Sequence, residues 1–161
     1  MTLLITPDLT AAQLRDLVQT VAAVPERWRN LVRHGGERHF ACLHRDDAVE
    51  IWVVSWMPGH DTGFHDHDDS AAAILVADGA IREQRLAVGA PNVDRHFGAG
   101  QTFAVRPSDI HRVQHAGEVP SVTIHAYSPP LRRVGQYEVA PNGTLQRYTQ
   151  NASEELKPIA T

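Results

Sequence analysis

The N-terminal part of the chain alternates apolar and polar residues at helical spacing. Within residues 8–33 the apolar positions recur three or four apart, at Leu14, Leu17, Val18, Val21 and Val24. This period predicts an amphipathic helix that Asp8 or Thr10 can cap. Proline is favoured in the first turn of a helix, so Pro25 predicts the start of a second helix, which carries Trp28, Leu31 and Val32.

A different pattern begins at Arg38, where short apolar or alternating runs are separated by glycine, proline, asparagine or aspartate. The runs occupy residues 48–56, 71–77, 80–88, 101–105, 121–127, 134–139 and 144–149. Such runs are typical of strands, and strands at this spacing favour a closed barrel or sandwich over a parallel sheet. The pattern therefore predicts one all-β domain, with a helical N-terminal cap at 1–37, a barrel at 38–150 and a loosely packed C-terminal tail at 151–161.

Length and charge narrow the classes of function. A chain of 161 residues suits one domain with a full core. The net charge is -4 and neither sign forms a block, so we expect no nucleic-acid partner. No stretch resembles a secretory leader or approaches about 18 consecutive apolar residues, so we expect a cytoplasmic monomer or homodimer with no membrane partner. Cys42 is the only cysteine, which excludes an intrachain disulfide.

The chain contains 10 histidines, and three of them suggest a metal site. His65 and His67 lie two positions apart at the entry to the run at 71–77, so both imidazoles would point to one face of a strand. His111 follows a Pro-Ser-Asp turn and leads into another strand, which makes it the best third ligand. The alternative is that all three are solvated surface residues. The remaining histidines are interpreted as surface residues (His34, His44 and His96) or as loop residues close to the site (His60 and His115).

Two segments resemble the motifs of the cupin superfamily. The segment "PGHDTGFHDH…ADG" is similar to the first motif, with matches at Gly59, His65, His67 and Gly79. The glutamate of that motif would fall at Ala71 or Ala72 and is absent. The segment "GQTFAVRPSDIHRVQH" is similar to the second motif, with matches at Gly100, Pro107 and His111. The resemblance implies a double-stranded β-helix barrel with a metal inside it.

Among the cupins, the chain most resembles the cysteine dioxygenase (thiol dioxygenase) family. The similarity lies in residues 56–67, 111–113 and 121–130. It implies that His65, His67 and His111 bind Fe(2+), and that the enzyme adds both atoms of O2 to the sulfur of a small thiol to give a sulfinic acid. Three neutral imidazoles leave the ion its full charge and three open positions, which suits an anionic thiolate and O2. Candidate thiols are L-cysteine, mercaptopropionate, cysteamine and a thiol-imidazole.

Thr123, His125 and Tyr127 fall on one face of the strand predicted at 121–127, because strand side chains alternate. The resemblance implies that these three form a catalytic hydrogen-bonded relay that ends at the Tyr127 hydroxyl. The alternative is that His125 and Tyr127 are core residues with satisfied polar tips. Some members of the family carry a cysteine cross-linked to the tyrosine; this chain has Ala72 at that place, so no such cofactor is expected.

The resemblance also implies a substrate-binding residue, which would fall at Arg38, His39 or Phe40. Members of the family hold the substrate carboxylate with an arginine on the strand before the run at 48–56. Arg38 would bind a carboxylate through two hydrogen bonds, His39 suits a weaker or differently shaped anion, and Phe40 suits an apolar or aromatic thiol. A surface role for Arg38 is the alternative.

Two rival functions stay open. One is a different metal-dependent cupin, such as a dioxygenase that acts on a carbon substrate or an isomerase. The other is a non-catalytic cupin that binds a small molecule. The missing glutamate and the Thr-x-His-x-Tyr segment at 123–127 favour the thiol dioxygenase over the first. The sequence contains no DNA-reading motif that would accompany a sensor, which counts against the second.

Overall fold

The helical period of the N-terminal segment forms one α-helix, α1 (Ala11–Ala22), in a computed structural model that describes residues 8–152. Thr10 caps the helix: its hydroxyl accepts from the Gln13 backbone N–H, and the Gln13 side chain accepts from the Thr10 backbone N–H. Leu14, Val18 and Val21 are buried, and this face of the helix packs on the outside of the barrel. The amphipathic helix predicted from the spacing is therefore present.

The second helix predicted from Pro25 does begin at this proline, but it is not a continuous α-helix. Two short 3-10 turns stand there, η1 (Pro25–Arg27) and η2 (Arg29–Leu31), held by hydrogen bonds between residues three apart. Trp28 separates the turns with a backbone outside the helical region, at φ -129° and ψ -22°. Its indole is buried and donates to the Ala22 carbonyl, so burial of this large ring outweighs continuation of the helix.

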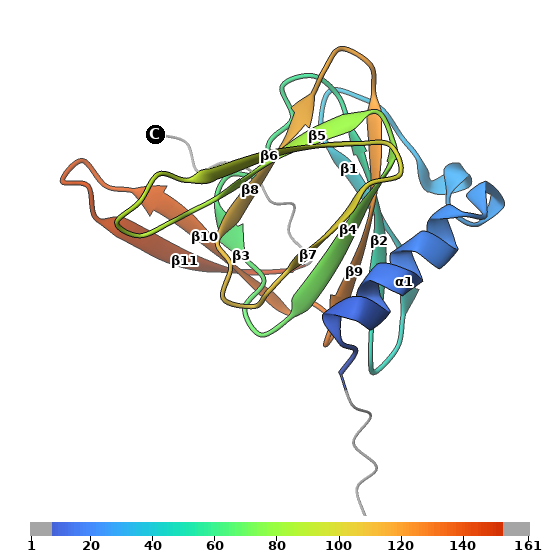
Figure 1. Cartoon of the computed structure of the whole chain (residues 1–161), viewed down its shortest axis with the longest axis horizontal. Helices are drawn as coiled ribbons and strands as arrows, with labels where there is room; N and C mark the ends of the chain where they lie inside the picture. Colours follow the sequence, from blue (N-terminus) through green and yellow to red (C-terminus); the bar gives the residue numbers. More distant parts are fainter. Residues whose placement is uncertain (1–7, 153–161) are drawn as a thin grey trace, which may run out of the picture.

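Two antiparallel sheets face each other and form the barrel (Figure 1). The first has the order β1-β2-β9-β4-β7, with β1 (His39–Arg45), β2 (Glu50–Trp56), β9 (Ser121–Ser128), β4 (Ala71–Asp78) and β7 (Thr102–Val105). The second has the order β11-β10-β3-β8-β5-β6, with β11 (Leu145–Asn151), β10 (Arg133–Val139), β3 (His65–Asp66), β8 (His111–Ala116), β5 (Ala80–Arg85) and β6 (Val93–Gly98). The all-β prediction is confirmed.

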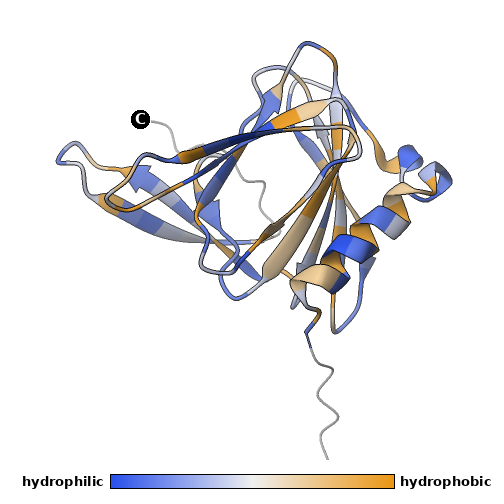
Figure 2. Cartoon of the chain, viewed as in Figure 1, coloured by the Kyte–Doolittle hydropathy of each residue, from blue (hydrophilic) through white to orange (hydrophobic). Residues whose placement is uncertain are grey.

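The two faces of the first sheet explain the apolar run at 71–77. Ala73 and Leu75 of β4 lie in a core cluster with α1, whereas Ala72, Ile74 and Val76 lie in a second cluster inside the barrel. Figure 2 shows this strand as an almost continuous hydrophobic band beneath the amphipathic helix. Because both faces are covered, the strand carries apolar residues at every position instead of at every second one.

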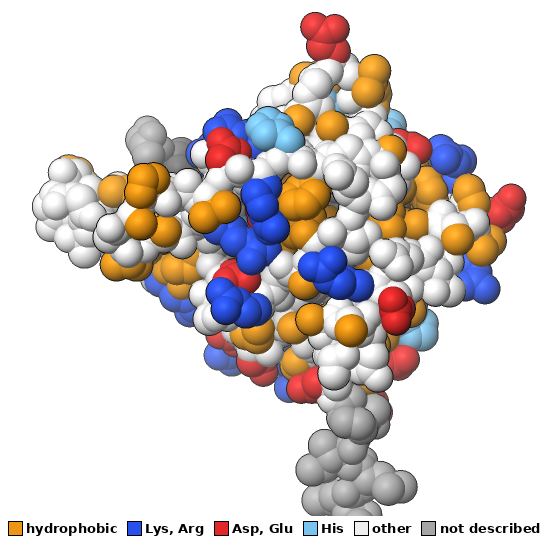
Figure 3. Space-filling view, in the orientation of Figure 1, with side chains coloured by type: hydrophobic (Ala, Val, Ile, Leu, Met, Phe, Trp, Pro, Cys, Tyr) orange, Lys and Arg blue, Asp and Glu red, His pale blue; other side chains and the backbone are white. Residues whose placement is uncertain are grey.

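The position of the histidine pair differs from the sequence interpretation. His65 and His67 do not enter the strand at 71–77; His65 lies in the separate two-residue strand β3, and a turn closed by the Ser70 N–H to the His67 carbonyl leads to β4. Strand β6 was also missed, because none of its residues is fully buried and they carry no apolar alternation. Figure 3 shows the basic side chains over this part of the barrel, close to acidic ones.

The boundaries between cap, barrel and tail stay a prediction. Residues 1–7 and 153–161, which include most of the predicted tail, lie outside the described residues. Within residues 8–152, no helix has the length and apolar character needed to cross a bilayer.

Candidate metal centre

The structure brings His65, His67 and His111 together inside the barrel. Strand β3 pairs with β8 so that His65 lies directly opposite His111, and His67 follows one residue after β3. One nitrogen of each ring lies within 4.8 Å of the others, and all three side chains are buried. Among residues 8–152, these three histidines are the one cluster of His, Cys, Asp or Glu side chains that could hold a metal ion.

The other ring nitrogens show how each imidazole is held. His65 Nδ1 lies 3.0 Å from the Gly63 carbonyl, and His111 Nδ1 lies 2.8 Å from Glu83 Oε2. Each is therefore an N–H that donates, which leaves the Nε2 lone pair for a ligand. His111 Nε2 is buried and has no hydrogen-bond partner among residues 8–152. An orphaned lone pair beside two further imidazoles fits a transition-metal ion.

The charge state of the site also fits a metal. Burial, together with the neighbouring charge of His111, lowers the pKa of both His65 and His67 well below the usual value. Both rings are therefore neutral at physiological pH, which is the form that binds a metal. The alternative that these histidines are solvated surface residues is wrong, because none of the three is more than 3% exposed.

The relay residues line up on the interior face of β9. Thr123 Oγ1 lies 2.7 Å from His125 Nε2, and His125 Nδ1 lies 3.0 Å from the Tyr127 hydroxyl. The Tyr127 ring packs edge-on against the ring of His67, with 5.1 Å between their centroids. The sequence did not reveal a fourth member: the indole Nε1 of Trp56 on β2 donates to Thr123 Oγ1 at 2.8 Å.

The direction of these hydrogen bonds follows from their donors. An indole N–H can only donate, so the Thr123 oxygen accepts from Trp56. Among the described residues, His125 Nε2 is the one acceptor within hydrogen-bond distance of the Thr123 hydroxyl, so the Thr123 O–H donates to it. Burial lowers the pKa of His125 to about 3, so the ring is neutral and carries its proton on Nδ1, which donates to the Tyr127 oxygen. The Tyr127 O–H is left to donate toward the cavity.

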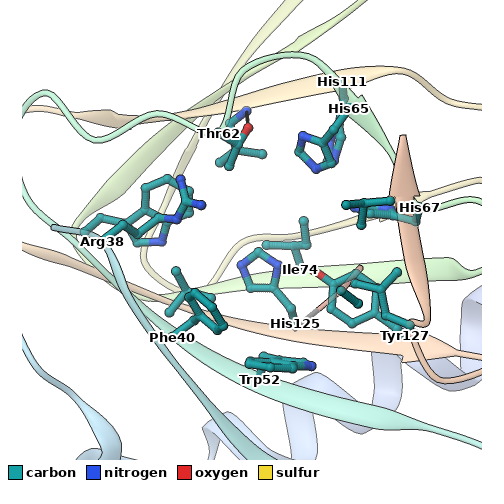
Figure 4. A pocket seen from close by; sticks show the side chains of 16 residues that line it. Arg38, Phe40, Trp52, Thr62, His65, His67, Ile74, His111, His125 and Tyr127 are labelled. Atoms are coloured by element: carbon teal, nitrogen blue, oxygen red, sulfur yellow. Dashed lines mark hydrogen bonds between the residues drawn. The ribbon is translucent and has the colours of Figure 1, made fainter. Parts of the chain in front are cut away.

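A cavity connects the three histidines with the relay (Figure 4). Arg38 and Phe40 line it, on the side opposite His67 and Tyr127, whereas His39 does not. Strand alternation explains the difference, since positions 38 and 40 share a face. Arg38 is only 8% exposed, so the surface role left open for it is wrong. Its guanidinium donates to the Asp61 carbonyl and lies over the Trp56 ring.

The walls of the cavity are mainly apolar. The rings of Phe40 and Trp52 pack with 5.0 Å between their centroids. The aliphatic wall consists of Val54, Ile74, Val113, Leu131 and Val134. Such a lining excludes water and leaves only a few polar groups to orient a ligand.

The remaining histidines lie away from the cavity wall. His34, His44 and His96 are exposed, as interpreted from the sequence. His60 bonds the Met57 N–H and the Gly36 carbonyl, and His115 bonds the Val119 carbonyl, so both fix loops. The strand position opposite Tyr127 is Ala72, and the single cysteine, Cys42, is exposed on β1.

Comparison with known proteins gives a family match and structural neighbours. The model of the family "Cysteine dioxygenase type I" matches residues 5–140. The cysteine dioxygenase type 1 of Danio rerio is 21% identical over 168 residues, which cover 92% of this chain and 84% of that protein. The human protein of the same name is 20% identical over 135 residues, which cover 77% of this chain and 68% of that protein.

A protein with a double-stranded β-helix domain from Klebsiella pneumoniae is a solved structural neighbour. It is 18% identical, with a TM-score of 0.55, and the match covers 74% of this chain and 91% of that one. The Cnp3 cupin domain of Schizosaccharomyces pombe is 13% identical, with a TM-score of 0.51 over 56% of this chain and 59% of that one. These neighbours show the fold, and the predicted cupin barrel is confirmed.

Proposed function

The chain belongs to the cysteine dioxygenase type I family, and on this basis we propose that it is a mononuclear Fe(II) thiol dioxygenase. The proposed reaction adds both atoms of O2 to the sulfur of a small thiol, so that RSH and O2 give the sulfinic acid RSO2H. The observation that carries the proposal is a buried group of three histidines, without a carboxylate ligand, beside a tyrosine hydroxyl.

The chemistry of the donor set supports this assignment. When bound, ferrous iron would supply the redox chemistry and hold a thiolate and O2 at neighbouring positions. The three imidazoles add no negative charge, so an anionic sulfur can bind there. Tyr127 directs its O–H into the cavity and can donate to an oxygen atom near the centre. Burial raises the pKa of Tyr127, which keeps the hydroxyl protonated as a donor.

Arg38 and Phe40 support a substrate that carries a carboxylate. The Arg38 guanidinium brings a positive charge to the cavity wall, and Phe40 provides an apolar surface beside it. We propose L-cysteine or another small thiol, with mercaptopropionate next in order. Cysteamine and a thiol-imidazole lack the carboxylate that Arg38 would bind. A cytoplasmic location and a monomeric or dimeric state stay predictions from the sequence.

The experiment that tests the function is mass spectrometry of the products from a mixed thiol panel under 18O2. A sulfinic acid that carries two labelled oxygens is the expected product, and it identifies the thiol at the same time. Oxygen consumption with a diketone and with no thiol would contradict the proposal in favour of a carbon-substrate dioxygenase. Protein that binds iron yet consumes no O2 with any of these compounds would favour a non-catalytic cupin.

A further inference from the structure

Glu83 is a buried carboxylate that the proposed reaction does not use. It lies in the middle of β5, and its exposed fraction is 0%. Neighbouring strands pair on both sides of it: Val113 of β8 lies opposite on one side and Arg95 of β6 on the other. A fully buried charge is costly unless it has partners, so the contacts of this side chain need an explanation.

One oxygen of Glu83 contacts the candidate ligand His111. Oε2 lies 2.8 Å from His111 Nδ1 and also accepts from Arg85 Nη2 at 3.4 Å. Oε1 accepts from Arg85 Nε and from Arg95 Nε, each at 3.1 Å. The carboxylate thus links two partly exposed guanidinium groups to a buried imidazole inside the barrel.

The partners of Glu83 compensate the burial of its charge. Two guanidinium groups, those of Arg85 and Arg95, form ion pairs with this carboxylate. A charge-assisted hydrogen bond to Nδ1 is stronger than a bond between neutral groups.

The three candidate ligands differ in what holds them. His65 Nδ1 donates to a neutral carbonyl, that of Gly63, and His67 Nδ1 has no partner among the described residues. Only His111, of the three, donates to a carboxylate. A carboxylate partner fixes the tautomer and the ring orientation, and it raises the basicity of the opposite nitrogen.

We propose that Glu83 is a positioning residue of the metal centre, which holds His111 with its proton on Nδ1 and its Nε2 lone pair toward the ion. Glu83 thereby makes His111 the strongest of the three donors. The proposal rests on the metal centre of the proposed function, not on the thiol chemistry, so a protein without thiol oxygenase activity would still test it.

The test is a titration of the metal-free protein with Zn2+ against a competing chelator, with no thiol and no O2. Glu83→Gln keeps the shape of the side chain and removes its charge. We expect its metal affinity to fall by about 10- to 100-fold. The matched control is Glu50→Gln, because Glu50 is equally buried but bonds the Trp52 indole instead of a candidate ligand. The control should bind Zn2+ as tightly as the unaltered protein.

A double-mutant cycle separates a role through His111 from a general effect of charge or folding. If Glu83 acts through His111, then Glu83→Gln should have no further effect on the weakened affinity of a His111→Ala protein. An equal loss in both backgrounds would overturn the proposal, and so would an unchanged affinity of the single variant. If Glu83→Gln does not fold, 15N NMR of the unaltered metal-free protein decides: His111 should carry its proton on Nδ1, and a proton on Nε2 contradicts the proposal.

Discussion

The indole Nε1 of Trp56 lies 2.8 Å from the hydroxyl oxygen of Thr123, although the two residues are 67 positions apart in the chain. They sit on the paired strands β2 and β9, where Val54 lies opposite Thr123. The relay therefore begins at the indole N–H of Trp56, which can donate a hydrogen bond but cannot accept one. The protons of the relay therefore point in one direction, from the indole to the Tyr127 hydroxyl.

Thr123→Val should disturb the relay without removing the metal. The variant leaves the Trp56 N–H without an acceptor and His125 Nε2 without a donor, which costs about 1–3 kcal/mol of stability. We expect kcat to fall by about tenfold, because the Tyr127 hydroxyl is then held less firmly and about 1.4 kcal/mol of lost transition-state stabilisation corresponds to one decade in rate. Thr123→Ser, which retains the hydroxyl, is the control and should stay close to the unaltered protein. A fully active valine variant would refute the relay.

Tyr127→Phe should separate catalysis from metal binding. The phenylalanine keeps the packing against His67 and removes the O–H that points into the cavity. Loss of one directed donor lowers kcat by about 100-fold or more. Metal content, measured by elemental analysis, should be unchanged. His67→Ala is the contrasting variant, because it should lose the metal and the O2 uptake together.

Local periodicity was enough to predict the parts of the molecule that depend on neighbouring residues. The first helix, most strands of the barrel and the grouping of Thr123, His125 and Tyr127 on one face follow from spacings of two, three or four positions. The helix predicted from Pro25 is not continuous, because the backbone at Trp28 leaves the helical region where its ring is buried. Local spacing does not reveal this burial.

Contacts between distant strands lay beyond that reasoning. Glu83 contacts His111 only because β5 pairs with β8, and Trp56 contacts Thr123 only because β2 pairs with β9. One signal for Glu83 was present, since it alternates with Ile81 and so shares the inward face of β5. A glutamate at an inward position of a barrel strand indicates a partner inside the barrel. The absent carboxylate ligand therefore does not leave the centre without a nearby negative charge.

Arg38→Gln should weaken binding of thiols that carry a carboxylate. Removing a charge-assisted hydrogen bond costs about 1.5–3 kcal/mol, which corresponds to a KM higher by about 10- to 100-fold for the acid identified under 18O2. A thiol without a carboxylate, such as 2-mercaptoethanol, should show the same KM with both proteins. Steady-state O2 uptake measures both. Equal losses for the two thiols would mean that Arg38 supports the structure and does not recognise the carboxylate.

The stability of the metal-free protein should depend on pH through His125. Burial lowers its pKa to about 3 in the folded protein, whereas the unfolded chain binds a proton near the ordinary value of about 6.5. Between these values the unfolded state binds more protons, so the free energy of unfolding falls as the pH falls, by up to about 1.4 kcal/mol per pH unit from this residue.

Urea denaturation between about pH 7 and pH 5 measures this dependence. His125→Gln removes the titrating group. The free energy of unfolding of this variant should therefore depend less steeply on pH, by up to about 1.4 kcal/mol per pH unit, which corresponds to one proton. His65 and His67 titrate in both proteins, so the difference between the two slopes isolates His125. Identical slopes would contradict a neutral, buried His125.

Arg147 and Gly135 should stabilise the short strand β3 as one unit. The Asp66 carboxylate, which lies between His65 and His67 in the sequence, accepts from Arg147 Nε and Nη2 at 3.0 Å, and from the Gly135 N–H at 3.1 Å. A Cβ at position 135 would overlap the Arg147 guanidinium. Gly135→Ala should therefore displace the same side chain that Arg147→Gln removes.

Each of the two variants should lower the free energy of unfolding by about 1–3 kcal/mol, because each leaves the buried Asp66 carboxylate short of donors. Their effects should not add, since both act through the same ion pair. Urea denaturation of the single and double variants measures this. A double variant less stable than either single variant by the full sum would show that Gly135 and Arg147 act independently, and that the arginine does not hold β3 through Asp66.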